Sequence, residues 1–291
     1  MSDTLFVLFQ YLTPKQWLTQ FAGAVARARG GQWTHALIRW FVGKYHVNMD
    51  EAAQPDITQY ACFNDFFTRA LKPGARPLAD AAFVCPVDGA ISQLGHIDGD
   101  QIFQAKGHTY STQALVGGDA TLAAQFQDGD FATIYLSPKD YHRIHMPSAG
   151  RLRRMIHVPG DLFSVNPATA RGVPGLFARN ERVVCVFDMP ANSSGATDET
   201  PQQYVLVLVG ATIVGSMATP WHGVVNPPRP GKVREWIYDD PKLTLKQGDE
   251  MGRFLLGSTV VLLWPKHTIS LNPSWQAAQG VRLGEKMGDA V

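Results

Sequence analysis

The stretch Arg253-Phe-Leu-Leu-Gly-Ser-Thr-Val-Val-Leu-Leu-Trp264 sets three small residues inside an otherwise apolar run. The unbroken apolar residues after Thr259 predict a buried strand. Gly257 gives such a strand no side chain to pack, and the hydroxyl groups of Ser258 and Thr259 need hydrogen-bond partners once they are buried. The stretch therefore indicates a buried strand in a β-rich core. Packing alone does not explain why Gly257, Ser258 and Thr259 stand inside its apolar run.

The composition is typical of a globular protein in a reducing compartment. The 291 residues are 45% hydrophobic and 18% charged, which suits one large domain or one domain with an appendage. A formal net charge of +1 argues against a nucleic-acid partner, because phosphates call for a basic surface. Cys62, Cys85 and Cys185 are far apart and show no Cys-x-x-Cys spacing, so we expect reduced, buried thiols.

The apolar N-terminus predicts helices and no membrane span. The run Leu5-Phe-Val-Leu-Phe9 is broken by Gln10, far short of the ~20 residues that cross a bilayer. The basic stretch and the cleavage site of a secretory signal are also missing. We expect a helix with Thr13 as its N-cap and Pro14 at its first position, ended by Gly30-Gly31.

This helix carries an apolar stripe for which two interpretations stay open. Trp17, Phe21 and Val25 recur every fourth residue. The stripe packs on the core of the protein, or it enters a lipid surface as an interfacial helix does. Further helical segments are expected at residues 33–42 and 64–71, before the breaker Lys72-Pro-Gly74.

After Pro77 the sequence changes to short β-branched and aromatic runs bounded by Gly, Pro and Asp. No helical pattern alternates with them, so a doubly wound parallel sheet is disfavoured. We therefore predict an α+β fold, with an N-terminal helical region at residues 1–75 and a mainly antiparallel β-rich catalytic domain at residues 76–291. A polar loop is expected at residues 190–203. The clearest strands are at residues 131–136, 182–187, 204–209 and 259–264.

Four residues from three segments carry reactive side chains: Asp88, His142, His145 and Ser258. Each alone has a structural explanation, such as a hairpin turn at Asp88-Gly89 or a strand cap at Ser258. Together they supply an acid, a base and a hydroxyl, as an activated nucleophile requires. The Gly-x-Ser-x-Gly elbow of α/β-hydrolases is missing. A zinc site on the two histidines would lack further ligands at suitable spacing, so no metal is predicted.

Five segments of the chain together form a pattern that none of them forms alone. They are DFFTRALKPGARP at residues 65–77, PVDGAIS at 86–92, YHRIHMP at 141–147, GDLFSVN at 160–166 and GRFLLGSTVV at 252–261. In this order, over roughly two hundred residues, they resemble the signature blocks of the pyruvoyl-dependent phosphatidylserine decarboxylases of the prokaryotic type. The segment Leu256-Gly-Ser-Thr259 matches the self-cleavage motif of that family without change.

The resemblance implies a proenzyme that cuts itself between Gly257 and Ser258. Attack by the Ser258 hydroxyl on the Gly257 carbonyl gives an ester, and elimination and hydrolysis convert the serine into a covalent pyruvoyl group, the only cofactor. Glycine leaves room for a strained backbone and a close approach. Asp88 and His145 take the roles of orienter and general base. The chains 1–257 and 258–291 stay associated because the small one contributes a core strand.

The resemblance also implies the reaction. The pyruvoyl carbonyl forms a Schiff base with phosphatidylserine, carbon dioxide leaves, and His142 or His145 protonates the carbanion, which yields phosphatidylethanolamine. Phe163, Ser164 and Asn166 are candidates for substrate binding. The substrate lies in a membrane, so a peripheral position on the cytoplasmic side of the cell membrane is expected, without a transmembrane helix. No nucleic-acid partner is expected, and the family also implies a homodimer.

Three alternatives remain open. A pyruvoyl decarboxylase of a soluble amino acid would share the self-cleavage but not the lipid preference. A serine hydrolase that uses Asp88, His145 and Ser258 would keep an unbroken chain. A β-domain that only binds another protein would tolerate the replacement of all three residues.

Overall fold

The computed structural model describes residues 3–190, 201–213, 216–227, 229, 231–257 and 259–291. Its N-terminal part is helical, as expected: α1 (Asp3–Leu12), α2 (Lys15–Arg27), α3 (Gln32–Tyr45), the 3-10 turn η1 (Ile57–Gln59) and α4 (Phe63–Phe67). A β-rich part follows, and every strand pair of the described residues is antiparallel. The α+β prediction is confirmed.

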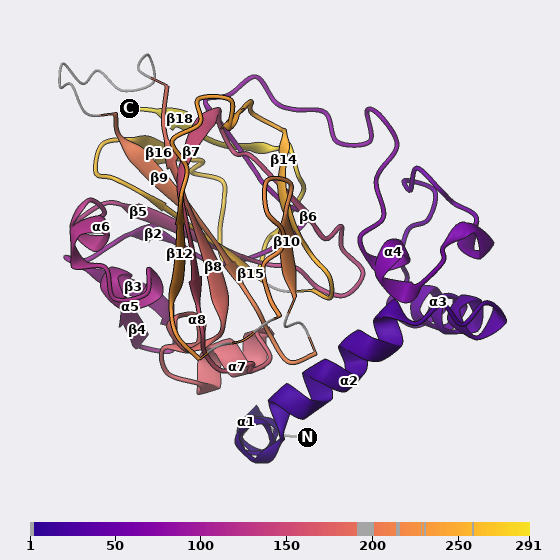
Figure 1. Ribbon diagram of the computed structural model, residues 1–291. Coiled ribbons are helices and arrows are strands. Elements are labelled where there is room, and N and C mark those ends of the chain that lie inside the picture. Colours follow the sequence, from indigo (N-terminus) through magenta and orange to yellow (C-terminus); the bar gives the residue numbers. More distant parts are fainter. Residues whose placement is uncertain (1–2, 191–200, 214–215, 228, 230, 258) are drawn as a thin grey trace.

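A nine-stranded sheet forms the centre of the molecule (Figure 1). β13 (Thr244–Leu245) pairs with β7 beside the main path. The other strands run, in spatial order, β12 (Arg234–Ile237), β7 (Gly150–Val158), β8 (Arg182–Asp188), β9 (Gln203–Val209), β15 (Thr259–Trp264), β5 (Asp130–Tyr135), β2 (Gly89–His96) and β17 (Gly280–Val281). The four strands expected from the sequence are β5, β8, β9 and β15, which lie side by side at its centre.

Smaller sheets and helices cover the two faces of this large sheet. One small sheet runs β11 (Gly223–Val224), β10 (Met217–Thr219), β14 (Glu250–Phe254), β6 (Arg143–His145), and another runs β1 (Phe83–Val84), β18 (Lys286–Ala290), β16 (Ile269–Leu271). The opposite face carries the hairpin of β3 (Gln101–Ala105) and β4 (His108–Ser111), with α5 (Thr112–Leu115), α6 (Ala120–Ala124), α7 (Pro167–Gly172) and α8 (Leu176–Arg179).

The strand that carries the opening stretch is buried on both faces. β15 pairs with β9 and β5, and its six residues are all buried. Leu262 packs in the core cluster shared with the small sheets, whereas Val261 packs in the cluster shared with the helices. A two-sided core explains why the sequence reads as a continuous apolar run instead of an alternating one.

The N-terminal helices have a small core of their own. Ile38, Phe63, Phe66 and Phe67 are buried together in it, and Leu256 of the opening stretch packs against the same cluster. In Figure 1, α2 and α3 extend to one side of the sheets, with α4 beside them. The helical part thus reaches the segment that precedes Gly257.

The predicted capping of α2 is wrong. The helix begins at Lys15 with Pro14 as its N-cap and no capping side chain, and it ends at Arg27. The Thr13 hydroxyl instead donates to the carbonyl of Phe9 at the end of α1. Proline forms the joint between the two helices because it lacks the N–H that would continue the first.

The thiol prediction is confirmed, since Cys62, Cys85 and Cys185 are free and buried. The predicted polar loop at 190–203 falls mainly on residues 191–200, which lie outside the described part of the chain.

Candidate active site

Gly257 lies where the chain passes from one sheet to another. β14 belongs to the four-stranded sheet and β15 to the nine-stranded sheet, and Gly257 stands in the short link between them. Ser258 lies outside the described residues. A Cβ added to Gly257 would stand 3.1 Å from Cε1 of His142, tighter than most such contacts. The φ of Gly257 is not in the left-handed region, so the close approach of His142 is the feature that favours glycine here.

His142 is buried against the helical part of the molecule. The side chain is 0% exposed, and its ring stacks on Phe67 with centroids 4.1 Å apart and planes at 17°. Neither ring nitrogen has a hydrogen-bond partner among the described residues. Burial, with a smaller contribution from the positive charge of Arg69, lowers the pKa of His142 to about 3. The ring is therefore neutral near pH 7.

His145 is held in one tautomer by its two partners. Nδ1 lies 2.7 Å from the carbonyl oxygen of Gly248, and Nε2 lies 3.1 Å from the hydroxyl of Tyr141. A carbonyl only accepts, so Nδ1 carries the proton, and Nε2 accepts from Tyr141. Burial lowers the pKa of His145. Its Nε2 is thus the basic nitrogen, as a general base requires.

Asp88 is an ion-pair partner of Arg76. Arg76 Nη2 lies 2.6 Å from Asp88 Oδ2, Arg76 Nε donates to both carboxylate oxygens, and the N–H of Leu283 donates to Oδ1. The same guanidinium reaches Glu51 at 2.7 Å. No hydrogen bond between Asp88 and His145 is present among the described residues. Asp88 and Glu51 together hold the pKa of Arg76 above its usual range.

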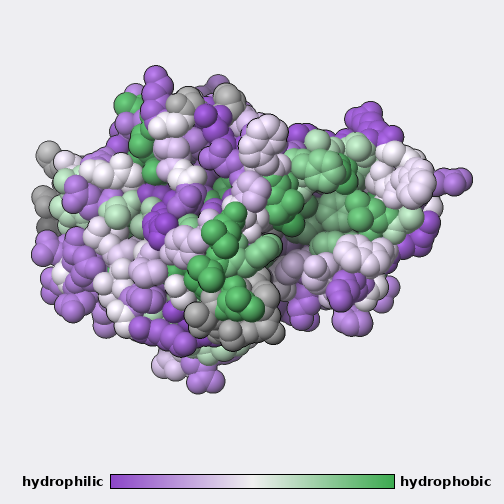
Figure 2. All heavy atoms as spheres, turned by 90° about the horizontal axis from the view of Figure 1, so that it is seen from below, coloured by the Kyte–Doolittle hydropathy of each residue, from purple (hydrophilic) through white to green (hydrophobic). Residues whose placement is uncertain are grey.

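Two cavities lie on either side of a shared wall made by Tyr135 and Val165. The first, of about 520 Å³, is apolar and is bounded by Gly257, by Phe67 and by apolar residues of α2 and α3. Figure 2 shows apolar side chains gathered over the N-terminal helices, around a hollow in the surface. An apolar cavity of this size beside Gly257 suits hydrocarbon better than a free amino acid.

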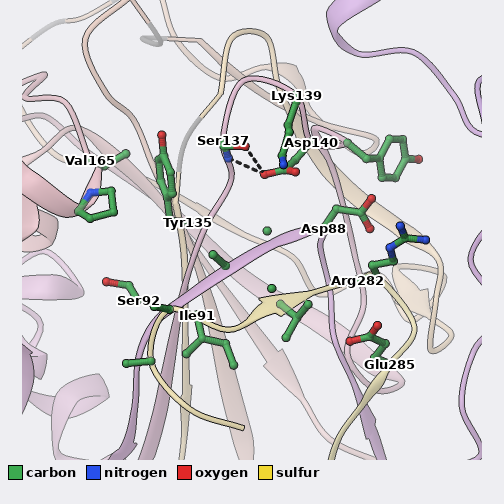
Figure 3. A pocket seen from close by; sticks show the side chains of 18 of the residues that line it. Asp88, Ile91, Ser92, Tyr135, Ser137, Lys139, Asp140, Val165, Arg282 and Glu285 are labelled. Atoms are coloured by element: carbon green, nitrogen blue, oxygen red, sulfur yellow. Dashed lines mark hydrogen bonds between the residues drawn. The ribbon is translucent and has the colours of Figure 1, made fainter. Parts of the chain in front are cut away.

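The second cavity, of about 990 Å³, is lined by more charged and polar side chains than the first (Figure 3). Asp88, Lys139, Asp140 and Arg282 lie around it, and Asp140 accepts hydrogen bonds from the backbone and hydroxyl of Ser137 at 2.7 Å. Asp88 borders this cavity, whereas Gly257 borders the apolar one, so the two predicted functional segments line different cavities that share Tyr135 and Val165.

The three predicted substrate-binding residues have different surroundings. Phe163 is 1% exposed, and its ring is covered by Tyr11, at 5.0 Å between centroids, and by the ammonium group of Lys15, so it lies in the core. Asn166 is the N-cap of α7 and accepts from the N–H of Thr169. Ser164 does line the apolar cavity. Their role in binding stays a prediction.

Several neighbours of these residues had no separate signal in the sequence. Phe67 and Arg76 fall inside the segment 65–77, and Tyr141 precedes His142, so the segments were found but the contacts were not. Among the described residues, no group of three or more His, Cys, Asp or Glu side chains could hold a metal ion.

Gly257 stands in the link between two sheets, against the buried imidazole of His142, and a serine follows it in the sequence. A backbone carbonyl followed by a hydroxyl side chain is what self-processing at an internal serine requires. A family model described as phosphatidylserine decarboxylase matches residues 63–289, and a second, described as PSD, matches residues 5–46. The chain belongs to the phosphatidylserine decarboxylase family.

Similar proteins cover almost the whole chain. A protein of Acidovorax ebreus named phosphatidylserine decarboxylase proenzyme is 69% identical to this chain, and the match covers 99% of this chain and 98% of the relative. Proteins of the same name are 66% identical in Dechloromonas aromatica, with 99% of both chains covered, and 68% identical in Methylibium petroleiphilum, with 100% of this chain and 99% of the relative covered.

Proposed function

We propose that the chain is a proenzyme that cleaves itself between Gly257 and Ser258 and then converts phosphatidylserine to phosphatidylethanolamine and carbon dioxide. The observation that carries the proposal is the position of Gly257, which borders an apolar cavity and stands against the ring of His142. The name of the relatives supports it, because a proenzyme is a precursor that is processed.

In the self-cleavage, the Oγ of Ser258 attacks the carbonyl carbon of Gly257. The C–N bond breaks, the nitrogen takes up a proton, and an ester forms. Elimination then frees the carboxylate of Gly257 and leaves dehydroalanine, whose hydrolysis releases ammonia and leaves a pyruvoyl group. His145 is the general base, with Nδ1–H fixed on Gly248 and Nε2 as the acceptor nitrogen. Asp88 adds negative charge near this ring.

The residues around Gly257 fit a group that reacts with a lipid amine. When formed, the pyruvoyl group supplies a carbonyl that binds the amine and withdraws the electron pair released with carbon dioxide. Within the part of the chain that the structure describes, the two ring nitrogens of His142 are buried without a hydrogen-bond partner, so they are available to a ligand at this site. A carboxylate placed beside this ring would raise its pKa, because an opposite charge favours the charged form. His142 then holds the proton that Cα needs.

The N-terminal helices provide the membrane contact in this proposal. Large apolar side chains of α1, α2 and α3 are exposed, among them Leu12 at 77%, Trp17 at 77% and Phe21 at 69%. Residues 4–49 hold five Lys or Arg residues and no Asp or Glu, which suits an anionic lipid surface. No described helix has the length and apolar character needed to cross a bilayer. The division near residue 75, the cytoplasmic face of the membrane and a homodimer remain parts of this proposal, supported by the family resemblance.

The test is the intact mass of the denatured protein, combined with an assay on lipid vesicles. Wild type is expected to give two chains that end and begin at the 257–258 bond, and to release carbon dioxide from phosphatidylserine. The Ser258→Ala variant is expected to remain one chain without activity. An active chain that stays whole would favour the hydrolase alternative, and decarboxylation of free serine in preference to the lipid would favour a soluble substrate.

A further inference from the structure

Two buried polar side chains stand out on helices that are otherwise rich in exposed apolar residues. Gln10 of α1 is 6% exposed and Thr19 of α2 is 5% exposed. Their neighbours Phe9 and Leu18 are 59% and 41% exposed. A helix that only had to pack on the protein would place an apolar residue at such positions, since burying a polar group without a partner is unfavourable. The partners of Gln10 and Thr19 therefore indicate what these two residues do.

Gln10 joins α1 to two loops of the β-rich part. Its Oε1 accepts from the N–H of Ser164 at 3.1 Å. The Thr212 hydroxyl lies 3.1 Å from the same oxygen and 2.6 Å from the carbonyl oxygen of Leu162. One side chain thus ties residues 162–164 and 212, which are far apart in sequence, to the helix.

Thr19 holds a strained backbone position. Its Oγ1 accepts from the N–H of Ile213 at 3.0 Å. Ile213 has a φ of +62°, a conformation that is rare for a β-branched residue. Such a conformation persists only where the surroundings fix it, and it is frequent at functional sites. The hydrogen bond from Ile213 to α2 is one of the contacts that fix it.

The residues held in this way form a wall of the apolar cavity. Ser164, Thr212 and Ile213 all line it, together with Leu256 and Gly257. We propose that Gln10 and Thr19 are positioning residues, which keep this wall aligned with the helices that contact the membrane, so that a lipid passes from the bilayer to the site beside Gly257. The inference rests on the proposed function, because it needs a lipid substrate and membrane contact by α1 and α2.

The test compares two substrates. Thr19→Val and Gln10→Met keep the size of the side chain and remove its acceptor oxygen. Each is expected to lower kcat/KM on phosphatidylserine in vesicles about fivefold, as the loss of one buried hydrogen bond predicts. On dissolved short-chain phosphatidylserine, which enters without leaving a bilayer, the change is expected to stay below about twofold. Thr19→Ser keeps the hydroxyl and is expected to restore the wild-type ratio between the two substrates.

Two controls separate this inference from simpler effects. Gln20→Met changes an exposed residue of the same helix and is expected to leave the ratio unchanged. Co-sedimentation with vesicles is expected to be equal for all variants. Equal losses on both substrates, an unchanged ratio, or a loss explained by weaker vesicle binding would each overturn the inference.

A second measurement does not require maturation. In the Ser258→Ala background, Thr19→Val is expected to speed amide exchange at Ile213 about fivefold, and unchanged exchange there would also overturn the inference. The self-cleavage and the lipid decarboxylation of the wild type test the proposed function separately. If wild type neither cleaves itself nor decarboxylates the lipid, the proposed function fails, whereas wild-type activity with unaffected variants leaves it intact and removes only the inference.

Discussion

The ring of Phe67 stacks on the imidazole of His142, with centroids 4.1 Å apart and planes inclined by 17°. Phe67 belongs to the small core of the N-terminal helices, whereas His142 precedes strand β6 of the β-rich part. The helical region therefore supplies one wall of the site beside Gly257. A reaction at this site depends on the helices for geometry as well as for any contact with lipid.

Replacing Phe67 by Leu is expected to impair the decarboxylation more than the self-cleavage. Leucine keeps apolar volume but removes the flat surface that orients the His142 ring. A misplacement of about 1 Å can cost about a hundredfold in rate, so we expect a fall in kcat of between about tenfold and a hundredfold. Mass spectrometry measures the self-cleavage and carbon dioxide release measures kcat. An unchanged kcat would show that the stack does not orient His142.

The buried His142 should make the folded state acid-sensitive. Its pKa is about 3 in the folded chain against 6.5 for the ordinary side chain. Between these two pH values the unfolded chain binds more protons, so the free energy of unfolding falls as the pH falls, by up to about 1.4 kcal/mol per pH unit. Above pH 6.5 the contribution is constant.

Urea unfolding of Ser258→Ala protein at pH 5 and pH 7.5 measures this effect. Adding His142→Asn is expected to reduce the difference between the two pH values. His46→Asn is the matched control, because His46 is exposed and has a φ of +55°, which asparagine tolerates. An equal reduction in both variants would contradict the assignment to His142.

Replacing Arg76 by Met is expected to destabilise the fold and to slow the self-cleavage. The substitution leaves Asp88 buried without its bidentate partner, which typically costs about 3 kcal/mol. Urea unfolding in the Ser258→Ala background measures the stability, and the rate of appearance of two chains measures processing. Adding Asp88→Asn to Arg76→Met should recover part of the lost stability, because the uncompensated charge is then gone. No recovery would mean that Asp88 is not the main partner.

Periodicity and composition were sufficient to predict the α+β fold and its central strands. β5, β8, β9 and β15 are mostly apolar because they are covered on both faces, and such runs stand out in a sequence. The N-cap of α2 was mispredicted because Thr13 has two competing hydrogen-bond choices, and its hydroxyl ends α1 instead. Local signals do not decide between two adjacent helices that share a joint.

The reactive residues could be found from the sequence, but their partners could not. Asp88 pairs with Arg76 across a loop of no regular spacing, and His145 pairs with Gly248, which lies 103 residues away in the chain. The covered position of Phe163 follows in the same way from the packing of α1 on its ring. No spacing rule contains these contacts, since they arise only when the sheets and helices assemble.

Shortening a core residue of β15 is expected to weaken the association of the two chains after cleavage. Leu262 is 0% exposed in the centre of the large sheet, and Leu262→Ala typically costs about 2–5 kcal/mol. In the cleaved protein, the substitution weakens the association of chains 1–257 and 258–291 by this amount of free energy. Size exclusion in moderate urea should show loss of the small chain earlier than in wild type. Val291→Ala, at a 65% exposed position of the same chain, is the control and should behave as wild type.

Point substitutions on α2 test the membrane contact more directly than deletion of the helices. Deletion would uncover Phe67 and the small core around it, so a loss of activity would have two causes. Trp17→Ser removes exposed apolar surface, and Phe21→Ser does so at a residue that also lines the apolar cavity. Each is expected to weaken binding to vesicles about tenfold, the effect of losing about 1.5 kcal/mol of buried apolar surface. The self-cleavage should be unaffected, because it requires no membrane.

The control for these substitutions lies on the opposite part of the chain. Ile237 of β12 is 69% exposed, the same fraction as Phe21, so Ile237→Ser removes comparable apolar surface outside the N-terminal helices. Co-sedimentation with vesicles that contain phosphatidylserine measures the bound fraction. If Ile237→Ser lowers the bound fraction as much as Phe21→Ser does, non-specific adsorption through exposed apolar residues explains the binding. If only the α2 variants lose binding, and added salt weakens the wild type further through the basic residues of the helices, then α2 is the surface that meets the lipid.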